Sequence, residues 1–175
     1  MARRKTVKQV VDGKPTKTAV APKYIDTGST LLNLALSDDP FGGWRAGTIA
    51  NLIGDSSTGK TLALLTSMAL NHIKNPEYKN IHDDVESGVG FNMSEMFGES
   101  FAQSLEPPFM ENDIPMHSNE IEAFQANIMG WLAKKIPFYY GLDSLDALDS
   151  CEDKKKREEQ NDAYRKETDA KGTYG

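Results

Sequence analysis

The sequence predicts an α/β fold in which a parallel sheet is flanked by helices, and three observations support this. Short apolar strand candidates alternate with helical patterns along the chain, as they do in parallel α/β proteins. A glycine-rich loop, Gly54–Thr61, stands between a strand candidate and a helix candidate. The run Phe138–Leu142 is apolar throughout, as expected of a parallel strand that is buried on both faces.

The charge distribution divides the 175 residues into three parts. The formal net charge is -6, yet residues 1–23 carry seven basic residues against one acid. We expect residues 1–22 to form a flexible basic arm, which either contacts phosphate groups or is simply solvated. Residues 23–150 form the expected core. Residues 151–175 are dense in charges, which predicts a solvated helix or a disordered segment.

Composition excludes several classes of protein. The chain has no run of eighteen apolar residues, so we expect no membrane span. The basic N-terminus is not followed by an apolar segment, so we expect no secretory signal. The single cysteine, Cys151, has no Cys or His neighbour at zinc-ligand spacing. We therefore expect Cys151 to be an inert or surface thiol in a reducing cytoplasm.

The first expected elements precede the glycine-rich loop. Ordered structure is expected to begin near Tyr24. Ser29 or Thr30 can cap a short helix that continues to Leu36. The stretch 37–43, rich in Asp, Pro and Gly, then ends this helix as a loop.

The loop itself is framed by a strand and a helix in the predicted order. Residues 47–53 indicate a short strand that runs directly into Gly54. A helix is expected from Lys60 to about Ile73, and Pro76 prevents its extension. Apolar residues recur along it at helical spacing, namely Leu62, Leu65, Ala69 and Ile73.

Further elements follow in the second half of the chain. We expect a weaker strand at 78–84, a helix at 92–105 and a short strand at 114–117. Ser118 is expected to cap an amphipathic helix, and Phe138–Leu142 forms the last strand. The apolar side of that helix comprises Ile121, Phe124, Ile128, Trp131 and Leu132.

The glycine-rich loop fits the pattern G-x-x-x-x-G-K-[ST], which binds nucleoside triphosphates. Its residues are Gly54, Asp55, Ser56, Ser57, Thr58, Gly59, Lys60 and Thr61. The glycines permit a backbone whose N–H groups point inward at phosphates, next to a helix N-terminus. Lys60 then reaches the β- and γ-phosphates, and the Thr61 hydroxyl coordinates magnesium. Such a pattern arises by chance roughly once in tens of thousands of positions, so we expect ATP or a related nucleotide, with Mg²⁺ as co-ligand.

An acid at the end of a neighbouring strand is expected to complete the magnesium shell. The strand 138–142 is followed by Asp143 and Ser144, and Asp143 is our candidate; the alternative is an ordinary turn acid. Asp146 and Asp149 lie beyond the strand and are weaker candidates.

Hydrolysis of a bound triphosphate also needs a base that orients and activates water. The end of the strand 78–84 supplies three acids, Asp83, Asp84 and Glu86. Spacing alone does not choose among them.

Taken in order, these segments resemble the RecA recombinase family, particularly its phage-encoded members. The likeness covers roughly residues 25–150. The glycine-rich loop alone occurs in many nucleotide-binding families, whereas the ordered set is more specific. The segments that carry the likeness are Ile25–Ser29, Leu32–Leu36, Gly43–Gly47, Gly54–Thr61, Asp84–Glu86 and Leu142–Leu148.

The resemblance implies a P-loop NTPase with a RecA-like core: a DNA-dependent ATPase of homologous recombination and repair. Such a protein would assemble on single-stranded DNA as a filament or ring, in the cytoplasm, or the host cytoplasm if phage-encoded. Glu86 and Lys60 would be catalytic, with Glu86 activating water. The family's adenine-stacking aromatic falls near residues 90–93, where Phe91 is the only aromatic; core packing explains Phe91 about as well.

The resemblance also departs from the family near the end of the sequence. A Gly-Tyr-Gly-like segment leads, in the family, to a helix, a DNA-contacting loop and further strands, whereas here the sequence stops at 172–175. We therefore expect the N-terminal two-thirds of the core, truncated at the C-terminus. Two alternatives stay open: another RecA-fold motor of helicase or circadian-clock type, and a truncated remnant that binds nucleotide without turnover. Asp26–Ser29 with Leu34–Leu36 favours the recombinase.

Overall fold

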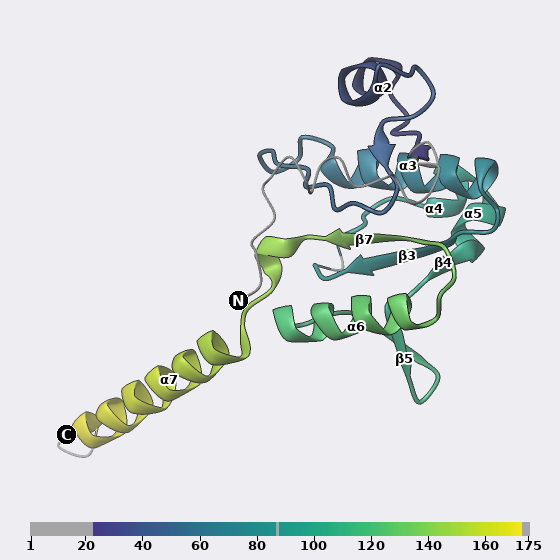
Figure 1. Ribbon diagram of the computed structural model, residues 1–175. Coiled ribbons are helices and arrows are strands. Elements are labelled where there is room, and N and C mark those ends of the chain that lie inside the picture. Colours follow the sequence, from purple (N-terminus) through teal and green to yellow (C-terminus); the bar gives the residue numbers. More distant parts are fainter. Residues whose placement is uncertain (1–22, 87, 173–175) are drawn as a thin grey trace, which may run out of the picture.

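The computed structural model describes residues 23–86 and 88–172, with the backbone alone for 165–172 (Figure 1). The expected basic arm, residues 1–22, lies outside the described residues. The described chain is a mixed α/β structure with a parallel sheet between helices. Within it, no helix has both the length and the apolar character needed to cross a membrane.

Three parallel strands form the central sheet in the order β4–β3–β7. β3 spans Lys79–Asp84, β4 spans Leu105–Glu106 and β7 spans Phe138–Asp143. The strands expected at 78–84 and 138–142 are thereby confirmed. β3 is central and buried along most of its length, whereas β4 and β7 are the two edge strands of this sheet among the described residues.

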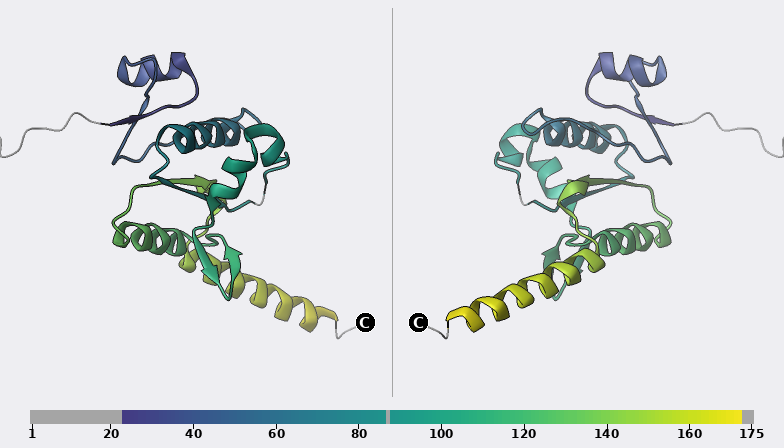
Figure 2. Two further views of the ribbon diagram at one scale, coloured as in Figure 1. Left: turned by 90° about the vertical axis from the view of Figure 1, so that its right-hand side faces the viewer. Right: turned by 90° about the vertical axis from the view of Figure 1, so that its left-hand side faces the viewer.

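Helices cover both faces of this sheet (Figures 1 and 2). α3, Lys60–Lys74, lies on one face and begins where the sequence predicts. Its buried apolar residues, Leu65, Met68 and Ala69, form a cluster with Phe101. The sequence predicted one apolar side for α3, and this prediction is partly wrong, because Leu62 is 44% and Ile73 is 74% exposed. The helix is rotated so that Met68, Ser67 and Asn71 lie inside instead.

The helix expected at 92–105 is broken into two. α4 spans Met93–Phe97, and the Asn92 side chain caps it by accepting hydrogen bonds from two backbone N–H groups. α5 spans Glu99–Ser104. Gly98 stands between them with a φ of 89° and a ψ of 151°, a conformation open mainly to glycine. The chain turns there, and Leu105 leaves the helical pattern to enter β4.

The strand expected at 47–53 is wrong. This segment forms no strand in the structure, and Ile49 and Ile53 are 98% and 90% exposed. A parallel strand forms only where a neighbour accepts and donates its backbone hydrogen bonds. No described strand lies beside 47–53 to do this, so its apolar pattern alone does not produce one.

A small N-terminal unit lies over α3 (Figure 2). In it β1, Tyr24–Ile25, pairs antiparallel with β2, Trp44–Arg45. α2, Thr30–Ser37, is capped by the Ser29 hydroxyl, one of the two expected caps. Ser67 of α3 donates a hydrogen bond of 2.6 Å to the backbone oxygen of Asp26 and so ties this unit to the core.

α6, Ile121–Ala133, covers the other face of the sheet. Its N-cap is Glu120, so the expected Ser118 cap is wrong; Ser118 is buried and bonds to Asp83 instead. The helix is less amphipathic than expected, because Ile121 is 42% and Leu132 is 54% exposed. Before it stands an antiparallel hairpin of β5, Phe109–Glu111, and β6, Ile114–Met116, which confirms the short strand expected at 114–117.

The charged C-terminal segment is helical. α7, Cys151–Gly172, projects away from the sheet after a short 3-10 turn, η1, at Leu145–Ala147 (Figure 1). The Cys151 thiol donates a hydrogen bond of 2.8 Å to a Glu120 carboxylate oxygen. That bond is the main cause that raises the pKa of Cys151 to about 11, so the thiol stays protonated and unreactive at neutral pH.

Candidate functional site

The glycine-rich loop leads directly into α3, and its backbone takes unusual conformations. Gly59 is the N-cap with a φ of 89°, and Ser57 has a φ of 62°. These angles lie in the left-handed region, which glycine enters without strain. No side chain caps the start of α3. The backbone N–H groups of its first turn therefore remain available to an external acceptor.

Lys60 folds back over the loop that precedes it. Its ammonium donates hydrogen bonds of 2.8 Å each to the backbone oxygens of Gly54 and Asp55. The Thr58 hydroxyl also donates to Asp55, at 2.8 Å. A Cβ at Gly54 would lie 2.9 Å from the Thr58 hydroxyl oxygen, so this position favours glycine. Two of the three ammonium protons are thus used, and one remains for an acidic ligand.

The packing of α3 on β7 indicates where Asp143 lies. The Tyr139 hydroxyl donates to the Ser67 hydroxyl oxygen at 3.1 Å. Two residues further along β7, a Cβ at Gly141 would lie 2.8 Å from a Leu64 methyl carbon. Moving along β7 from Tyr139 to Gly141 thus moves the contact on α3 back toward its N-terminus, from Ser67 to Leu64. Because alternate strand residues share a face, we expect Asp143 on this same face, further toward the end of α3 that carries Lys60 and Thr61.

Asp84 and Asp143 occupy the carboxyl ends of neighbouring strands. They are paired directly across β3 and β7, and the Val85 N–H extends the ladder by donating to the Asp143 backbone oxygen at 2.8 Å. The carboxylates of both act on the buried His82. Desolvation lowers the pKa of His82, and Asp84 and Asp143 oppose that shift. Carboxylate and hydroxyl oxygens are the ligands that Mg²⁺ prefers, so Thr61 and Asp143 suit this ion chemically.

Asp83 faces the opposite side of the sheet. Its side chain is fully buried and accepts hydrogen bonds from the Ser118 N–H at 2.8 Å and the Ser118 hydroxyl at 2.6 Å. The Tyr140 hydroxyl donates a third, at 2.6 Å. Two effects raise the pKa of Tyr140 above its ordinary value. Desolvation by burial is the larger, and the hydrogen bond to Asp83 is the next. A carboxylate occupied in this way has no access to water at the loop, so Asp83 is a structural acid.

Asp84 and Glu86 lie at the open end of β3. The Asp84 carboxylate accepts from the Gly88 N–H at 3.1 Å, and its own N–H donates to His117 Nδ1 at 3.1 Å. Glu86 is exposed, and the Ser144 hydroxyl donates to its Oε1 at 2.5 Å. Of the three acids left open by the sequence, Glu86 is the one whose side chain is exposed, since Asp83 is buried and Asp84 is half-buried.

Asp146 joins this group of residues, although the sequence favoured it less. It lies in η1, where the chain turns back directly after β7. A hydrogen bond from Ser144, one from its own backbone and the more distant Lys60 ammonium together hold its pKa below the ordinary value. Asp146 is thus within electrostatic range of Lys60. The turn after Asp143 produces this proximity, and no spacing rule for strands anticipates it.

Phe91 packs inside the molecule. It is half-buried against the cluster of Leu65, Met68, Ala69 and Phe101, and its ring centre lies 6.2 Å from that of Phe97. Core packing, which the sequence left open beside base stacking, accounts for this position.

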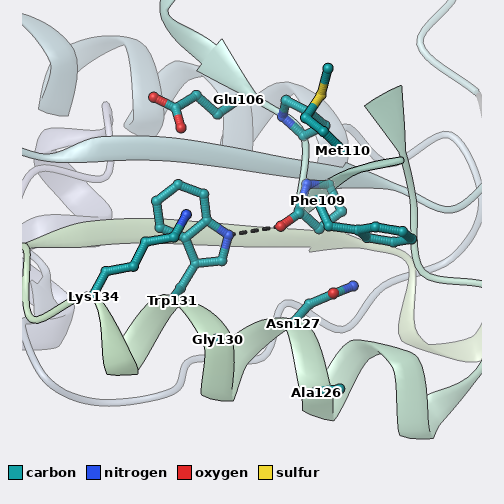
Figure 3. A pocket seen from close by; sticks show the side chains of 10 residues that line it. Glu106, Phe109, Met110, Ala126, Asn127, Gly130, Trp131 and Lys134 are labelled. Carbon is teal, nitrogen blue, oxygen red and sulfur yellow. Dashed lines mark hydrogen bonds between the residues drawn. The ribbon is translucent and has the colours of Figure 1, made fainter. Parts of the chain in front are cut away.

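A separate depression of about 420 Å³ lies between α6 and the segment leading into β5 (Figure 3). Its floor is Trp131, whose indole N–H donates to the Pro108 backbone oxygen at 3.0 Å. The Lys134 ammonium lies 3.2 Å from the centre of the Trp131 ring. This depression is on the α6 side of the sheet, whereas the glycine-rich loop leads into α3 on the other side, so the two are distinct.

The residues singled out by sequence thus separate into two groups. Lys60, Asp143 and Glu86 belong to elements that converge where α3 begins and where β3 and β7 end (Figure 1). Asp83 is fully buried, and Phe91 is half-buried against the core. No protein-family model, curated protein or solved structure matches the chain.

Proposed function

We propose that the chain binds ATP with Mg²⁺ at the glycine-rich loop and hydrolyses it. Two observations support this proposal. Lys60 opens α3, and its ammonium donates to the backbone oxygens of Gly54 and Asp55 in the glycine-rich loop. At the carboxyl ends of β7 and β3, the Ser144 hydroxyl bonds to Glu86. In this proposal a cation for phosphate stands at the start of α3, and acids for metal and water stand at the ends of β3 and β7.

Each residue has a distinct role in this proposal. The backbone N–H groups of 54–61 and the Lys60 ammonium bind the phosphates. Thr61 and Asp143 hold Mg²⁺, which when bound would neutralise charge on the triphosphate. Glu86 orients a water molecule and accepts its proton as the water oxygen bonds to the γ-phosphorus. The bond from that phosphorus to the bridging oxygen breaks, and ADP and phosphate leave.

We further propose that this ATPase is of the recombination type, assembling on single-stranded DNA as a filament or ring. The ordered set of segments from Ile25 to Leu148 supports this class. A second candidate is a protein that binds nucleotide without turnover. It is favoured by the exposed, unpaired segment 47–53, in which Ile49 and Ile53 have no partner strand among the described residues.

Phosphate release in the presence of Mg²⁺ and ATP, with and without single-stranded DNA, tests the proposal and separates the candidates. A recombination-type ATPase predicts release that rises severalfold with single-stranded DNA. A helicase-like motor predicts stimulation together with strand separation on a forked duplex. Nucleotide binding with no release under either condition would favour the non-hydrolytic candidate and contradict the ATPase.

A further inference from the structure

The ends of β3 and β7 hold two side chains in a fixed relation. Asp84 and Asp143 are paired residues, and the Val85 N–H donates to the Asp143 oxygen. Glu86 and Ser144 therefore leave the sheet side by side, although they are 58 residues apart. The backbone hydrogen bonds between β3 and β7 fix the positions of these two residues relative to each other. Two long side chains on an unpaired surface would meet only part of the time.

The contact itself is short and directional. The Ser144 hydroxyl oxygen lies 2.5 Å from Glu86 Oε1, within the range of hydrogen bonds from a hydroxyl to a carboxylate. An ionised carboxylate only accepts, and a serine hydroxyl has one proton to donate. Ser144 therefore occupies one oxygen of Glu86 and leaves the other available to a water molecule.

We infer that Ser144 is a positioning residue, which holds the exposed Glu86 carboxylate in the orientation that activates water. This inference rests on the proposed hydrolysis at the same site. Ser144 itself bonds neither to phosphate nor to metal in this role. Its loss should therefore affect turnover and leave nucleotide affinity nearly unchanged.

Steady-state phosphate release by the full chain tests this first. Ser144→Ala is expected to lower kcat about tenfold or more, with affinity for a slowly hydrolysed ATP analogue within about twofold. Ser144→Thr keeps the hydroxyl and is expected to restore most of kcat. The matched control is Ser150→Ala, because Ser150 makes a similar 2.8 Å bond to Asp153 at the start of α7; it should leave kcat unchanged.

A double-mutant cycle gives the sharper result. If Ser144 acts through Glu86, then Glu86→Gln and the double variant Glu86→Gln, Ser144→Ala should have about the same kcat. Losses that multiply in the double variant would overturn the inference, as would equal losses of affinity and kcat in Ser144→Ala.

A measurement independent of turnover separates this inference from the proposed function. Side-chain scalar couplings of Glu86, measured by NMR, are expected to report one rotamer in the wild-type chain and averaging in Ser144→Ala. If the wild-type chain binds the analogue but releases no phosphate, the proposed hydrolysis fails. In that case, a Glu86 side chain that is fixed in the wild-type chain and averaged in Ser144→Ala still supports the contact with Ser144. Averaging of Glu86 in the wild-type chain overturns the inference whatever the rate of phosphate release.

Discussion

Asp84 and Asp143 face each other across the last paired position of two parallel strands. The pair marks the edge of the sheet toward which α3 directs its N-terminus. Side chains from two separate parts of the sequence, Glu86 and Ser144, meet there. Because the arrangement depends on strand register, substitutions at this edge should affect different steps according to which strand carries them.

Asp143→Asn should weaken the contribution of Mg²⁺ to nucleotide binding, because an amide oxygen is a poorer ligand for a hard divalent cation than a carboxylate. We expect the affinity gained on adding Mg²⁺ to fall about tenfold, or about 1.4 kcal/mol. Calorimetric titration with and without Mg²⁺ measures it. The control is Asp113→Asn in the turn between β5 and β6. Asp113 has a φ of 64°, a conformation that asparagine adopts as readily as aspartate. An unchanged Mg²⁺ dependence in Asp143→Asn would remove Asp143 from the metal shell.

Glu86→Gln should slow phosphate release by about a hundredfold while nucleotide affinity is retained, because the amide cannot accept the proton of water. Asp84→Asn should have a smaller effect, since Asp84 is occupied by the Gly88 N–H. Single-turnover kinetics with both variants makes the comparison. If Asp84→Asn abolishes turnover and Glu86→Gln does not, Asp84 is the base.

Asp83→Asn should destabilise the fold and leave the proposed chemistry alone. Its two carboxylate oxygens accept three hydrogen bonds in a fully buried position, and an amide nitrogen cannot accept them. We expect the free energy of unfolding to fall by about 2–3 kcal/mol, measured by urea denaturation. Asp162→Asn, at an exposed position of α7, should change it by less than about 0.5 kcal/mol. A stable Asp83→Asn variant with lost turnover would show that Asp83 serves the reaction.

His82 should make stability depend on pH. Burial lowers its folded-state pKa below the unfolded value, so the unfolded chain binds the proton more readily than the folded chain. The contribution of neutral His82 is therefore present above the unfolded pKa of about 6.5 and is lost as pH falls below it. Urea denaturation between pH 8 and pH 5 should show a decline that is reduced in His82→Gln. Equal pH dependence in the two proteins would contradict this.

Local chemistry explains why some parts of this structure were predictable. The glycine-rich loop and the start of α3 depend on residues adjacent in sequence, and β7 is apolar enough to be recognised on its own. β3 has Ile81 as its one aliphatic residue, so its sequence predicted a strand more weakly. The segment 47–53 has a strand-like sequence but lacks a neighbouring strand among the described residues, and pairing is not a local property. Ser118 looked like a helix cap, but the buried carboxylate of Asp83 binds its hydroxyl.

The candidate site was predicted in its residue types more than in its contacts. Lys60 and Asp143 could each be named from a pattern, whereas the pattern left Asp83, Asp84 and Glu86 open and only the family resemblance favoured Glu86. The bond between Ser144 and Glu86 joins residues 58 positions apart and follows from the register of β3 on β7. The role of Asp146 arises from the turn of η1. Both contacts are products of tertiary structure, which spacing along one chain does not encode directly.

We propose above all that the glycine-rich loop binds a triphosphate through Lys60. Calorimetric titration of the full chain with a slowly hydrolysed ATP analogue and Mg²⁺ tests this most directly. The titration compares the wild-type protein with Lys60→Ala. The control is Lys156→Ala, on the exposed face of α7. We predict saturable binding by the wild-type and control proteins, and affinity at least about tenfold weaker in a folded Lys60→Ala protein, because a charge-assisted contact to phosphate is lost. Equal affinity in all three proteins, or no binding by the folded wild-type chain, would contradict the assignment.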